Sequence, residues 1–273
     1  MAKIILEAGR VNKEYWRDLW RYRELFQVLA WRDVSVRYKQ TVIGFAWAIL
    51  RPFLTMMVFT IIFGKVAKLP SDGNTPYALM VFAGLLPWQM FSTALADASN
   101  SLVNNQNLIA KVYFPRLIVP SATIVVAFVD FAISFGILCA MMVYFGFVPG
   151  WQILLMPVFI GIGVLASLGP ALWITSLNVQ YRDFRYVIPF IVQFGLYISP
   201  VGFSSSVIPD HWRYFYSLNP IVGVIDGFRW CVLGGESQIF WPGFLMSFLV
   251  IAFFLLFGIR KFREMERSFA DYI

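Results

Sequence analysis

Two acidic side chains lie within long apolar runs of the sequence, where a charge is difficult to solvate. Asp130 lies 12 residues into an apolar run at 118–146, and Asp97 lies near the end of another run. A carboxylate inside a membrane is costly and is a functional candidate by default. The same position suits a hydrogen-bonded group that holds helices together, and both interpretations stay open. Proton transfer is disfavoured, because Asp97 is the one further acidic partner along the apolar runs.

Basic side chains gather around the start of the first long apolar run. They are Arg32, Arg37, Lys39 and Arg51. Guanidinium groups match the geometry of phosphate oxygens, so the cluster predicts an entrance for an anionic, lipid-linked substrate. The alternative for each single residue is that its charge reaches toward lipid headgroups. Arg51 precedes Pro52, which predicts a kink or a break in the helix there.

Motifs of the common catalytic classes are absent from the sequence. Its single Gly-Lys pair, Gly64-Lys65, lacks the flanking residues of a phosphate-binding loop, and no HExxH, GxSxG or Cys/His cluster occurs. Cys139 and Cys231 are not expected to form a disulfide, since Cys139 lies in an apolar run, and His211 is expected to be a surface residue. We expect neither a catalytic site nor a metal or cofactor in this chain, so work against a gradient would need a separate energy-supplying subunit.

Composition identifies the class of protein that must position these side chains. Of the 273 residues, 59% are hydrophobic and 14% are charged, against about 25% charged in soluble domains. Long apolar runs predict an all-α membrane protein rather than a barrel, whose strands alternate in polarity. At about 20 residues per crossing, six transmembrane helices are expected. They are placed at 45–66, 77–98, 118–146, 151–177, 186–202 and 239–259.

The basic residues predict how the chain is oriented. Segments 1–44, 99–117, 178–185 and 260–273 hold 17 Lys or Arg, whereas the opposite side holds four. The positive-inside rule therefore makes both termini cytoplasmic. The net charge of +7 does not indicate nucleic acid, because the basic residues cluster at span ends. No cleavable signal peptide is visible, since the first 40 residues carry nine Lys or Arg and no uninterrupted apolar run.

Two segments outside the spans carry helical patterns of their own. In the N-terminal region (1–44), apolar residues recur at helical spacing opposite a polar face, which predicts an amphipathic helix in the membrane interface plane or, alternatively, packed on a partner. The apolar face holds Tyr15, Leu19, Tyr22, Phe26 and Leu29, with Trp16 and Trp20 beside them, and the polar face holds Lys13, Arg17, Arg21 and Glu24. Loop 99–117 is longer than a connector needs, and its second half predicts a short exposed helix that docks a partner.

Segment 201–238 is too apolar and aromatic for a solvated loop, and too interrupted by Pro and Gly for a span. Its placement on the outer side predicts short re-entrant helices in the outer half of the membrane, forming a gate before the last span. The candidate gate aromatics are Trp212, Tyr214, Phe215 and Tyr216. They suit stacking on sugar rings, although interfacial anchoring explains most aromatic residues at span ends.

Four stretches, in register with the expected spans, carry a family resemblance. They are RDVSVRYKQTVIGFAWAILRP (32–52), KVYFPRLIVP (111–120), NVQYRDFRYVIPFIVQFGLYISPVGFSSSVIP (178–209) and LNPIVGVIDGFRWCVLG (218–234). Together they resemble the ABC-2-type permeases that export O-antigen, capsule and teichoic acid polymers. The match covers the chain from about residue 25 to its end.

The resemblance implies a homodimer in the bacterial cytoplasmic membrane, with two copies of an ATPase subunit that bind ATP and magnesium beneath it. It implies that the substrate is a glycan on undecaprenyl pyrophosphate and that residues 203–218 are external gate helices. It also implies that the 99–117 loop is the helix that couples the ATPase to the spans. The residues expected to do so are Asn107, Leu108, Lys111, Val112, Phe114 and Arg116.

Two other functions are weighed against polysaccharide export. An ABC-2 exporter of drugs or other small molecules would share the topology, but the RYKQTVIG and YFPR stretches favour a glycan. A membrane-embedded lipid-modifying enzyme would need polar catalytic residues at one membrane face. Asp97 and Asp183 are the nearest candidates, and no nucleophile or metal motif accompanies them.

Overall fold

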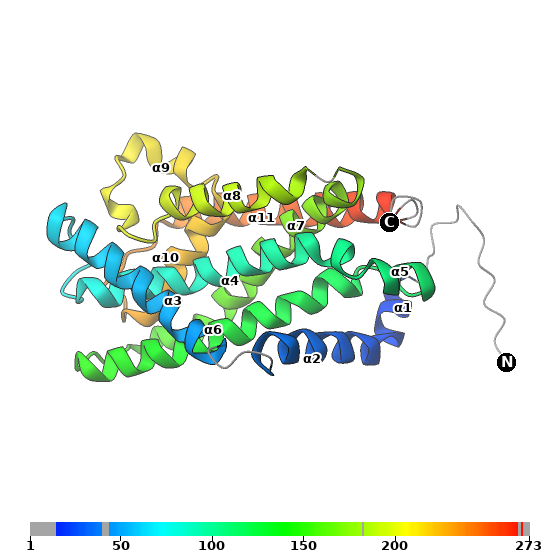
Figure 1. Cartoon of the computed structure of the whole chain (residues 1–273). Coiled ribbons are helices and arrows are strands. Elements are labelled where there is room, and N and C mark those ends of the chain that lie inside the picture. Colours follow the sequence, from blue (N-terminus) through cyan, green and yellow to red (C-terminus); the bar gives the residue numbers. More distant parts are fainter. Residues whose placement is uncertain (1–14, 40–43, 182, 267–268, 270–273) are drawn as a thin grey trace.

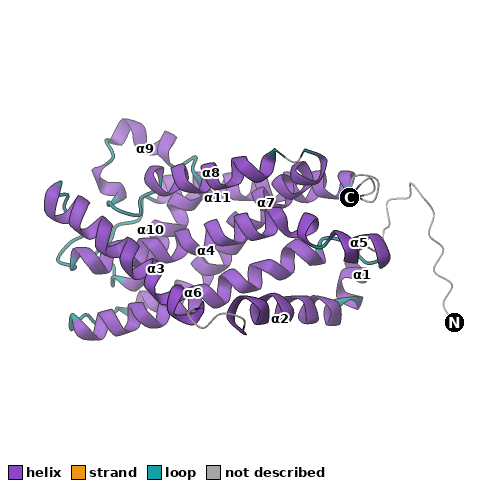
Figure 2. Ribbon diagram, viewed as in Figure 1, coloured by secondary structure: helices purple, strands orange, loops and turns teal. Residues whose placement is uncertain are grey.

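The computed structural model describes residues 15–39, 44–181, 183–266 and 269, and these residues form an all-helical bundle without strands (Figures 1 and 2). The N-terminal 14 residues, with Lys13, lie outside this description, as do residues 40–43. The first half comprises α1 Tyr15–Arg21, α2 Arg23–Lys39, α3 Gly44–Phe59, the π-helix η1 Thr60–Val66, α4 Tyr77–Asn104, α5 Gln106–Lys111 and α6 Ile118–Tyr144. The second half comprises the 3-10 helix η2 Trp151–Leu155, α7 Met156–Gln180, α8 Phe184–Ile198, the 3-10 helix η3 Ser205–Val207, α9 Asp210–Tyr216, α10 Pro220–Val232 and α11 Trp241–Met265.

Within the residues that the structure describes, five helical segments are long and apolar enough to cross a membrane, and six were expected. They are Ala46–Val66, Tyr77–Asn104, Ile118–Tyr144, Trp151–Gln180 and Trp241–Met265. The fifth expected span, at 186–202, corresponds to α8, which has 15 residues, fewer than the roughly 20 that a crossing needs. Helix α8 ends where the chain turns extended at Ser199, immediately before Pro200, so the six-span prediction is not confirmed.

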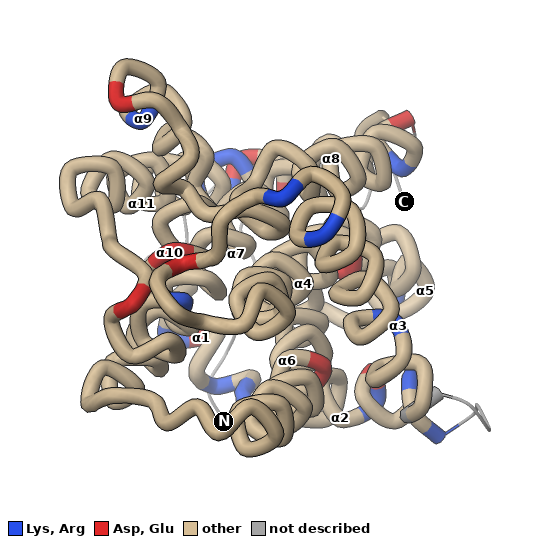
Figure 3. Tube along the Cα trace, turned by 90° about the vertical axis from the view of Figure 1, so that its left-hand side faces the viewer, with Lys and Arg blue, Asp and Glu red and all other residues tan. Residues whose placement is uncertain are grey.

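Helix α4 forms the centre of the bundle, and α3 lies at its periphery. In the apolar window of α4, 83% of residues are buried, compared with 17% in the span that contains α3. Viewed along the bundle, α4 lies near the middle (Figure 3). It packs against α6, α7 and α10. The apolar side chains that α3 leaves exposed have lipid or a second protein chain as their natural surroundings.

Close helix packing depends on small residues at one crossing. Helices α7 and α11 pass each other at Gly169 and Gly258, where a Cβ on Gly258 would lie 2.1 Å from the Gly169 carbonyl oxygen. Because no side chain fits there, the two backbones approach directly, as is common between membrane helices.

The predicted N-terminal helix is present, as α1 and α2. Helix α2 runs alongside the first half of α6, with its axis near that of the bundle (Figure 1). Leu29 and Ala30 are buried in the cluster that holds Leu117 and Ile118. Further along α2, polar contacts described below hold its C-terminal end to α4 and α6.

Segment 201–238 is helical in short pieces, as its Pro and Gly content predicts. Asn219 caps α10 by accepting a hydrogen bond from the Ile221 backbone N–H at 3.3 Å, and Pro220 begins the helix. Helix α10 is almost entirely buried and packs against α4, α7 and α11. Helix α9 packs mainly on α11. We call this end of the bundle the α9 end, and the opposite end, with α1, α5 and the end of α11, the α5 end (Figure 1).

Candidate functional site

The loop expected to dock a partner contains the predicted short helix, α5. Of the residues expected to dock a partner, Asn107, Lys111 and Val112 are exposed, whereas Leu108 is half-buried. After α5 the chain turns extended at Val112. Beyond this point, Tyr113 is 62% exposed, whereas Phe114 is 4% exposed. Phe114 packs inside the bundle, and Tyr113, which sequence reasoning missed, takes the outward position.

Arg116 is also engaged within the protein. Its backbone N–H donates to Glu266 Oε1 at 2.7 Å, and its guanidinium donates to the Glu266 backbone carbonyl. Burial raises the pKa of the Glu266 carboxyl, and the backbone hydrogen bond from Arg116 acts in the opposite direction. The Phe269 ring lies 5.9 Å from the guanidinium. The loop expected to dock a partner, residues 99–117, is thus fastened to the residues that follow α11. We call this contact the Arg116 clasp, and we refer to the segment, for its predicted role, as the docking loop.

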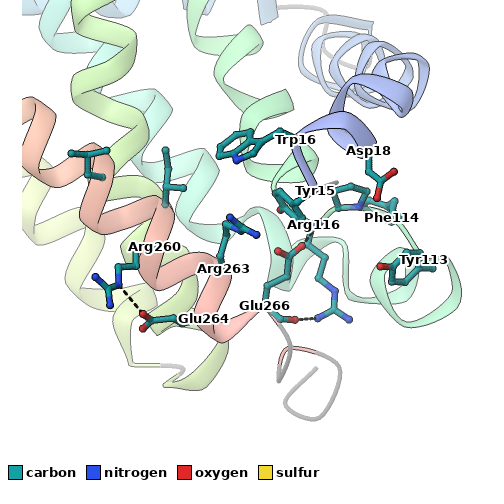
Figure 4. A pocket seen from close by; sticks show the side chains of 13 residues that line it. Tyr15, Trp16, Asp18, Tyr113, Phe114, Arg116, Arg260, Arg263, Glu264 and Glu266 are labelled. Atoms are coloured by element: carbon teal, nitrogen blue, oxygen red, sulfur yellow. Dashed lines mark hydrogen bonds and ion pairs between the residues drawn. The ribbon is translucent and has the colours of Figure 1, made fainter. Parts of the chain in front are cut away.

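A cavity of 790 Å³ opens beside the Arg116 clasp, between α1, residues 113–116 and the end of α11. The clasp lies on one side of it, and Arg260 with Glu264 on the other (Figure 4). The Arg263 guanidinium stacks 4.6 Å from the Tyr15 ring centre. Aromatic walls with both signs of charge suit contact with a protein surface better than they suit reaction chemistry.

The predicted basic cluster is divided by the structure. Arg37 Nη1 lies 2.9 Å from Asp97 Oδ2, and Arg37 Nη2 lies 2.8 Å from Asp130 Oδ2. The neighbouring Tyr38 hydroxyl donates to Asp130 Oδ1. We call these four residues the Arg37 cluster, because Arg37 of α2 joins α4 and α6 through it. Asp130 is therefore paired, which supports its interpretation as a group that holds helices together and leaves a transport role untested.

Arg51 of α3 faces the same place as the Arg37 cluster. Both arginines line a 240 Å³ cavity, together with Asp130 and the polar side chains of Gln89 and Thr93. In the described part of the chain, the Arg51 guanidinium has no hydrogen-bond or ion-pair partner.

The other two residues of the predicted cluster lie apart from this cavity. Arg32 binds Asp33 and the Asn105 side chain at 2.7 and 2.8 Å, and Lys39 is exposed. The structure thus brings Arg37 and Arg51 of the predicted cluster together with Asp130, which was considered separately, and leaves Arg32 and Lys39 outside.

The acidic pair considered for an enzyme is not assembled in the described residues. Asp97 is engaged by Arg37, while Asp183 is exposed before α8. Across the described ranges, no group of three or more His, Cys, Asp or Glu could hold a metal ion. Cys139 and Cys231 are both free thiols, so no disulfide joins them.

The predicted gate aromatics separate into two kinds. Trp212, Tyr214 and Phe215 are exposed on α9. Tyr216 is instead half-buried, and its hydroxyl is buried. The residue contributes to the lining of a 160 Å³ cavity between η3, α9, α10 and residues 238–240. Three of these side chains can therefore meet lipid or another molecule, and the fourth faces the interior.

Arg229 is the residue that sequence reasoning missed at the α9 end. It is fully buried, and its guanidinium donates to the backbone carbonyls of Met80, Val201 and Phe203 at 3.1, 2.8 and 2.9 Å. A Cβ on Gly84 would lie 2.4 Å from its Nη2 atom, so Gly84 leaves room for the guanidinium. The available sequence signal was an arginine between Phe228 and Trp230, in a helix whose one other charged residue is Asp226.

Comparisons with known proteins find relatives along most of the chain. The O-antigen export system permease protein RfbA of Myxococcus xanthus is 28% identical over 215 residues, 78% of this chain and 82% of its own. RfbA of Klebsiella pneumoniae is 26% identical over 238 residues, 85% and 91% of the two chains. The polysialic acid transport protein KpsM of Escherichia coli is 22% identical over 247 residues, 87% and 93%.

The family resemblance found in the sequence is confirmed, because the chain matches the model of a known protein family. The ABC-2 type transporter family matches residues 24–233, which is most of the chain and includes α2 through α10. The protein therefore belongs to the ABC-2 type transporter family.

Proposed function

We propose that this chain is the permease subunit of an ABC transporter that exports a lipid-linked, O-antigen-like polysaccharide across the bacterial cytoplasmic membrane. The observation that carries the proposal is similarity to O-antigen export permeases along most of both chains. The chain would work as a homodimer, with the polymer passing between protomers and with membrane lipid around them. The exposed apolar face of the α3 span supports such contacts.

A separate ATPase subunit, binding ATP and magnesium, supplies the energy in this proposal and docks at the α5 end. The excess of Lys and Arg in the segments assigned to that end supports a cytoplasmic orientation. The docking surface would consist of the exposed side chains Asn107, Lys111, Val112 and Tyr113. The 790 Å³ cavity next to Tyr113 would receive a projecting part of the ATPase. Phe114 and Arg116 would transmit motion of the ATPase to the spans, because they join this loop to the bundle.

The undecaprenyl pyrophosphate of the substrate would enter at the cavity shared by Arg37 and Arg51. Arg51 supports this assignment because its guanidinium lacks a partner in the described residues. Arg37 would exchange one of its two carboxylate partners for phosphate oxygens, since a guanidinium binds carboxylates and phosphates alike. The polymer would then leave past α9, whose exposed aromatics form the external gate.

The gene-deletion experiment tests the proposed function directly. In a strain without this chain, lipid-linked polymer should accumulate on the cytoplasmic side of the membrane, and surface glycan should disappear. Complementation with the wild-type gene should restore surface glycan. Unchanged surface glycan in the deletion strain would refute the proposal.

Export of a capsule polymer is the second candidate, and the similarity to KpsM favours it. Teichoic acid, drugs and other small molecules remain alternatives with weaker support. The deletion strain separates them as well. Loss of capsule with intact lipopolysaccharide would identify capsule export, whereas drug sensitivity with both glycans intact would identify a small-molecule exporter.

A further inference from the structure

The 790 Å³ cavity at the α5 end has two unlike sides. One side carries Tyr113 of the docking loop and Asp18, and it is the part that would receive the ATPase (Figure 4). The other side is formed by α11 together with Trp16 of α1, and we call it the α11 recess. Its lining side chains from α11 are Leu256, Ile259, Arg260 and Arg263. The proposed function leaves this second side without a role.

The α11 recess lies where the apolar part of α11 ends. From Trp241 to Ile259 this helix carries no charged side chain, which is about the length of one membrane crossing. Four of the next six residues are charged. Leu256 and Ile259 line the recess on the apolar side of this boundary, and Arg260 and Arg263 follow on the same helix face. The recess therefore has an apolar wall toward the membrane and a basic wall toward water.

The two guanidinium groups in the recess have hydrogen-bond donors to spare. Arg263 is half-buried, and its guanidinium stacks on the Tyr15 ring without a hydrogen bond or ion pair to any described residue. Arg260 donates through Nε to Glu264 at 3.0 Å, and neither of its Nη atoms donates to a described residue. Since a guanidinium carries five N–H donors, both side chains can bind acceptor oxygens from a ligand.

The carboxylates around the cavity leave these donors available. Glu264 is shared, because Lys261 Nζ donates to its Oε2 at 2.8 Å while Arg260 holds its Oε1. Glu266 attracts Arg263 without forming an ion pair with it, and its Oε1 accepts from the Arg116 clasp. Asp18 lies on the other side of the cavity, toward Tyr113 (Figure 4). The recess therefore lacks an acceptor that is negatively charged, and a phosphate supplies one.

The apolar wall indicates that this phosphate belongs to a lipid. Leu256 and Trp16 are exposed, so the recess opens to its surroundings on both sides of the boundary. Tryptophan is typical of the headgroup level of a membrane, and basic pockets between membrane helices bind anionic headgroups. A soluble partner would have to reach below this level to cover Leu256, whereas a phospholipid places its phosphate and its acyl chains on the matching sides.

We propose that the α11 recess binds one anionic phospholipid, with its phosphate at Arg263 and Arg260 and an acyl chain along Leu256 and Ile259. This inference goes beyond the proposed function and does not depend on the exported cargo. The ATPase keeps the side of the cavity with Tyr113. Because Arg263 stacks on a ring of α1, the bound lipid would help to fix α1 against α11 beside the docking loop.

Photocrosslinking of the full-length protein in lipid nanodiscs tests the inference. The probe is phosphatidylglycerol with a diazirine on one acyl chain, diluted into a phosphatidylcholine bilayer, and mass spectrometry locates the labelled residues. Residues 256–259 should be labelled more strongly than Leu245 and Leu249, which are exposed on the same helix without a basic neighbour. Excess unlabelled phosphatidylglycerol should remove this labelling, and a phosphatidylcholine probe should not reproduce it.

Substitutions of single charges separate a site from general attraction. Arg263→Gln should reduce labelling of residues 256–259 about fivefold or more. Lys261→Gln is the matched control, because it removes the same charge from the same helix turn but does not line the cavity, and it should be labelled nearly as the wild type is. Should Arg263→Gln loosen α1, as judged by a lower melting temperature, Arg260→Gln decides the question, because this exposed side chain can be replaced without disturbing packing. It should reduce labelling about twofold or more.

Three outcomes would overturn the inference. Uniform labelling of the exposed residues along α11 would show that lipid only surrounds the helix. Equal losses in Arg263→Gln and Lys261→Gln would show general attraction to basic residues. Labelling that disappears when the ATPase subunit is bound would assign the whole cavity to that subunit. The deletion experiment measures surface glycan, so failure of either proposal leaves the other in place.

Discussion

The two ends of the bundle hold their candidate functional segments by different means. At the α5 end, the docking loop is packed into an apolar cluster through Phe114 and fastened to the residues after α11 by the Arg116 clasp. At the α9 end, α9 is largely exposed and contacts mainly α11. The chain before it is held by Arg229, through the carbonyls of Val201 and Phe203.

This difference indicates which end can move at lower cost. Moving the docking loop away from the bundle would break apolar packing together with charged contacts. Because this is costly, the spans should move together with the loop. Moving α9 leaves the buried α10 and its arginine in place, since few buried contacts join α9 to the core. A segment with few buried contacts opens more readily than one inside a packed cluster. We therefore expect the α5 end to act as a rigid connection and α9 as the mobile element.

The largest expected effect comes from removing the buried arginine. Arg229→Ala leaves the carbonyls of Met80, Val201 and Phe203 without their donor, and it should destabilise the protein by about 4 kcal/mol or more. Arg213→Ala is the control, because this half-buried side chain binds carbonyls within its own segment, and about 1 kcal/mol is expected. Melting temperatures in nanodiscs measure both. Equal losses would show that Arg229 does not hold this end together.

Neighbouring residues of the docking loop should behave oppositely. Phe114→Ala removes a buried ring and should lower stability by about 3 kcal/mol. Tyr113→Ala removes an exposed ring and should change stability by about 0.5 kcal/mol or less. If the loop docks the ATPase, Tyr113→Ala should still reduce copurification of that subunit. A Tyr113→Ala protein with normal assembly and transport would remove Tyr113 from the docking surface.

The Arg37 cluster should contribute a smaller, measurable coupling. A double-mutant cycle with Arg37→Ala and Asp130→Asn should give a coupling of about 1 kcal/mol, since both side chains are partly accessible. Transport by Asp130→Asn answers a separate question. Full activity in that variant would confine Asp130 to a structural role, whereas lost activity with a normal melting temperature would assign it a part in transport.

The smallest effect is expected at Glu266 in the Arg116 clasp. Burial raises the pKa of this carboxyl, so its protonated form stabilises the folded state more than the charged form does. That contribution is fully present below the ordinary pKa and is lost as pH rises through the raised value. Glu266→Gln cannot lose a proton, so its melting temperature should fall less than that of the wild type as the pH rises above the ordinary pKa of a glutamate side chain. Identical pH profiles would contradict this assignment.

Local pattern explains which features of the fold could be predicted. The spans expected at 45–66 and 118–146 lie within two residues of the observed helical segments Ala46–Val66 and Ile118–Tyr144. An apolar run of sufficient length can be recognised in the sequence without knowing which helices pack beside it. The short helix α5 and the interruptions of segment 201–238 follow from local spacing and from Pro and Gly. The expected span at 186–202 is not confirmed, because an apolar run alone does not reveal that its helix ends after 15 residues.

By itself, the sequence determined the class of protein, its membrane helices and its family, since these depend on composition, run length and ordered motifs. Only the tertiary structure decided that Phe114 points inward beside an exposed Tyr113, and that Arg37 meets Asp130. It alone decided that Arg229 of α10 binds a carbonyl 149 residues away. Periodicity reports which face of a helix is apolar, but it carries no information on which distant segment will cover that face.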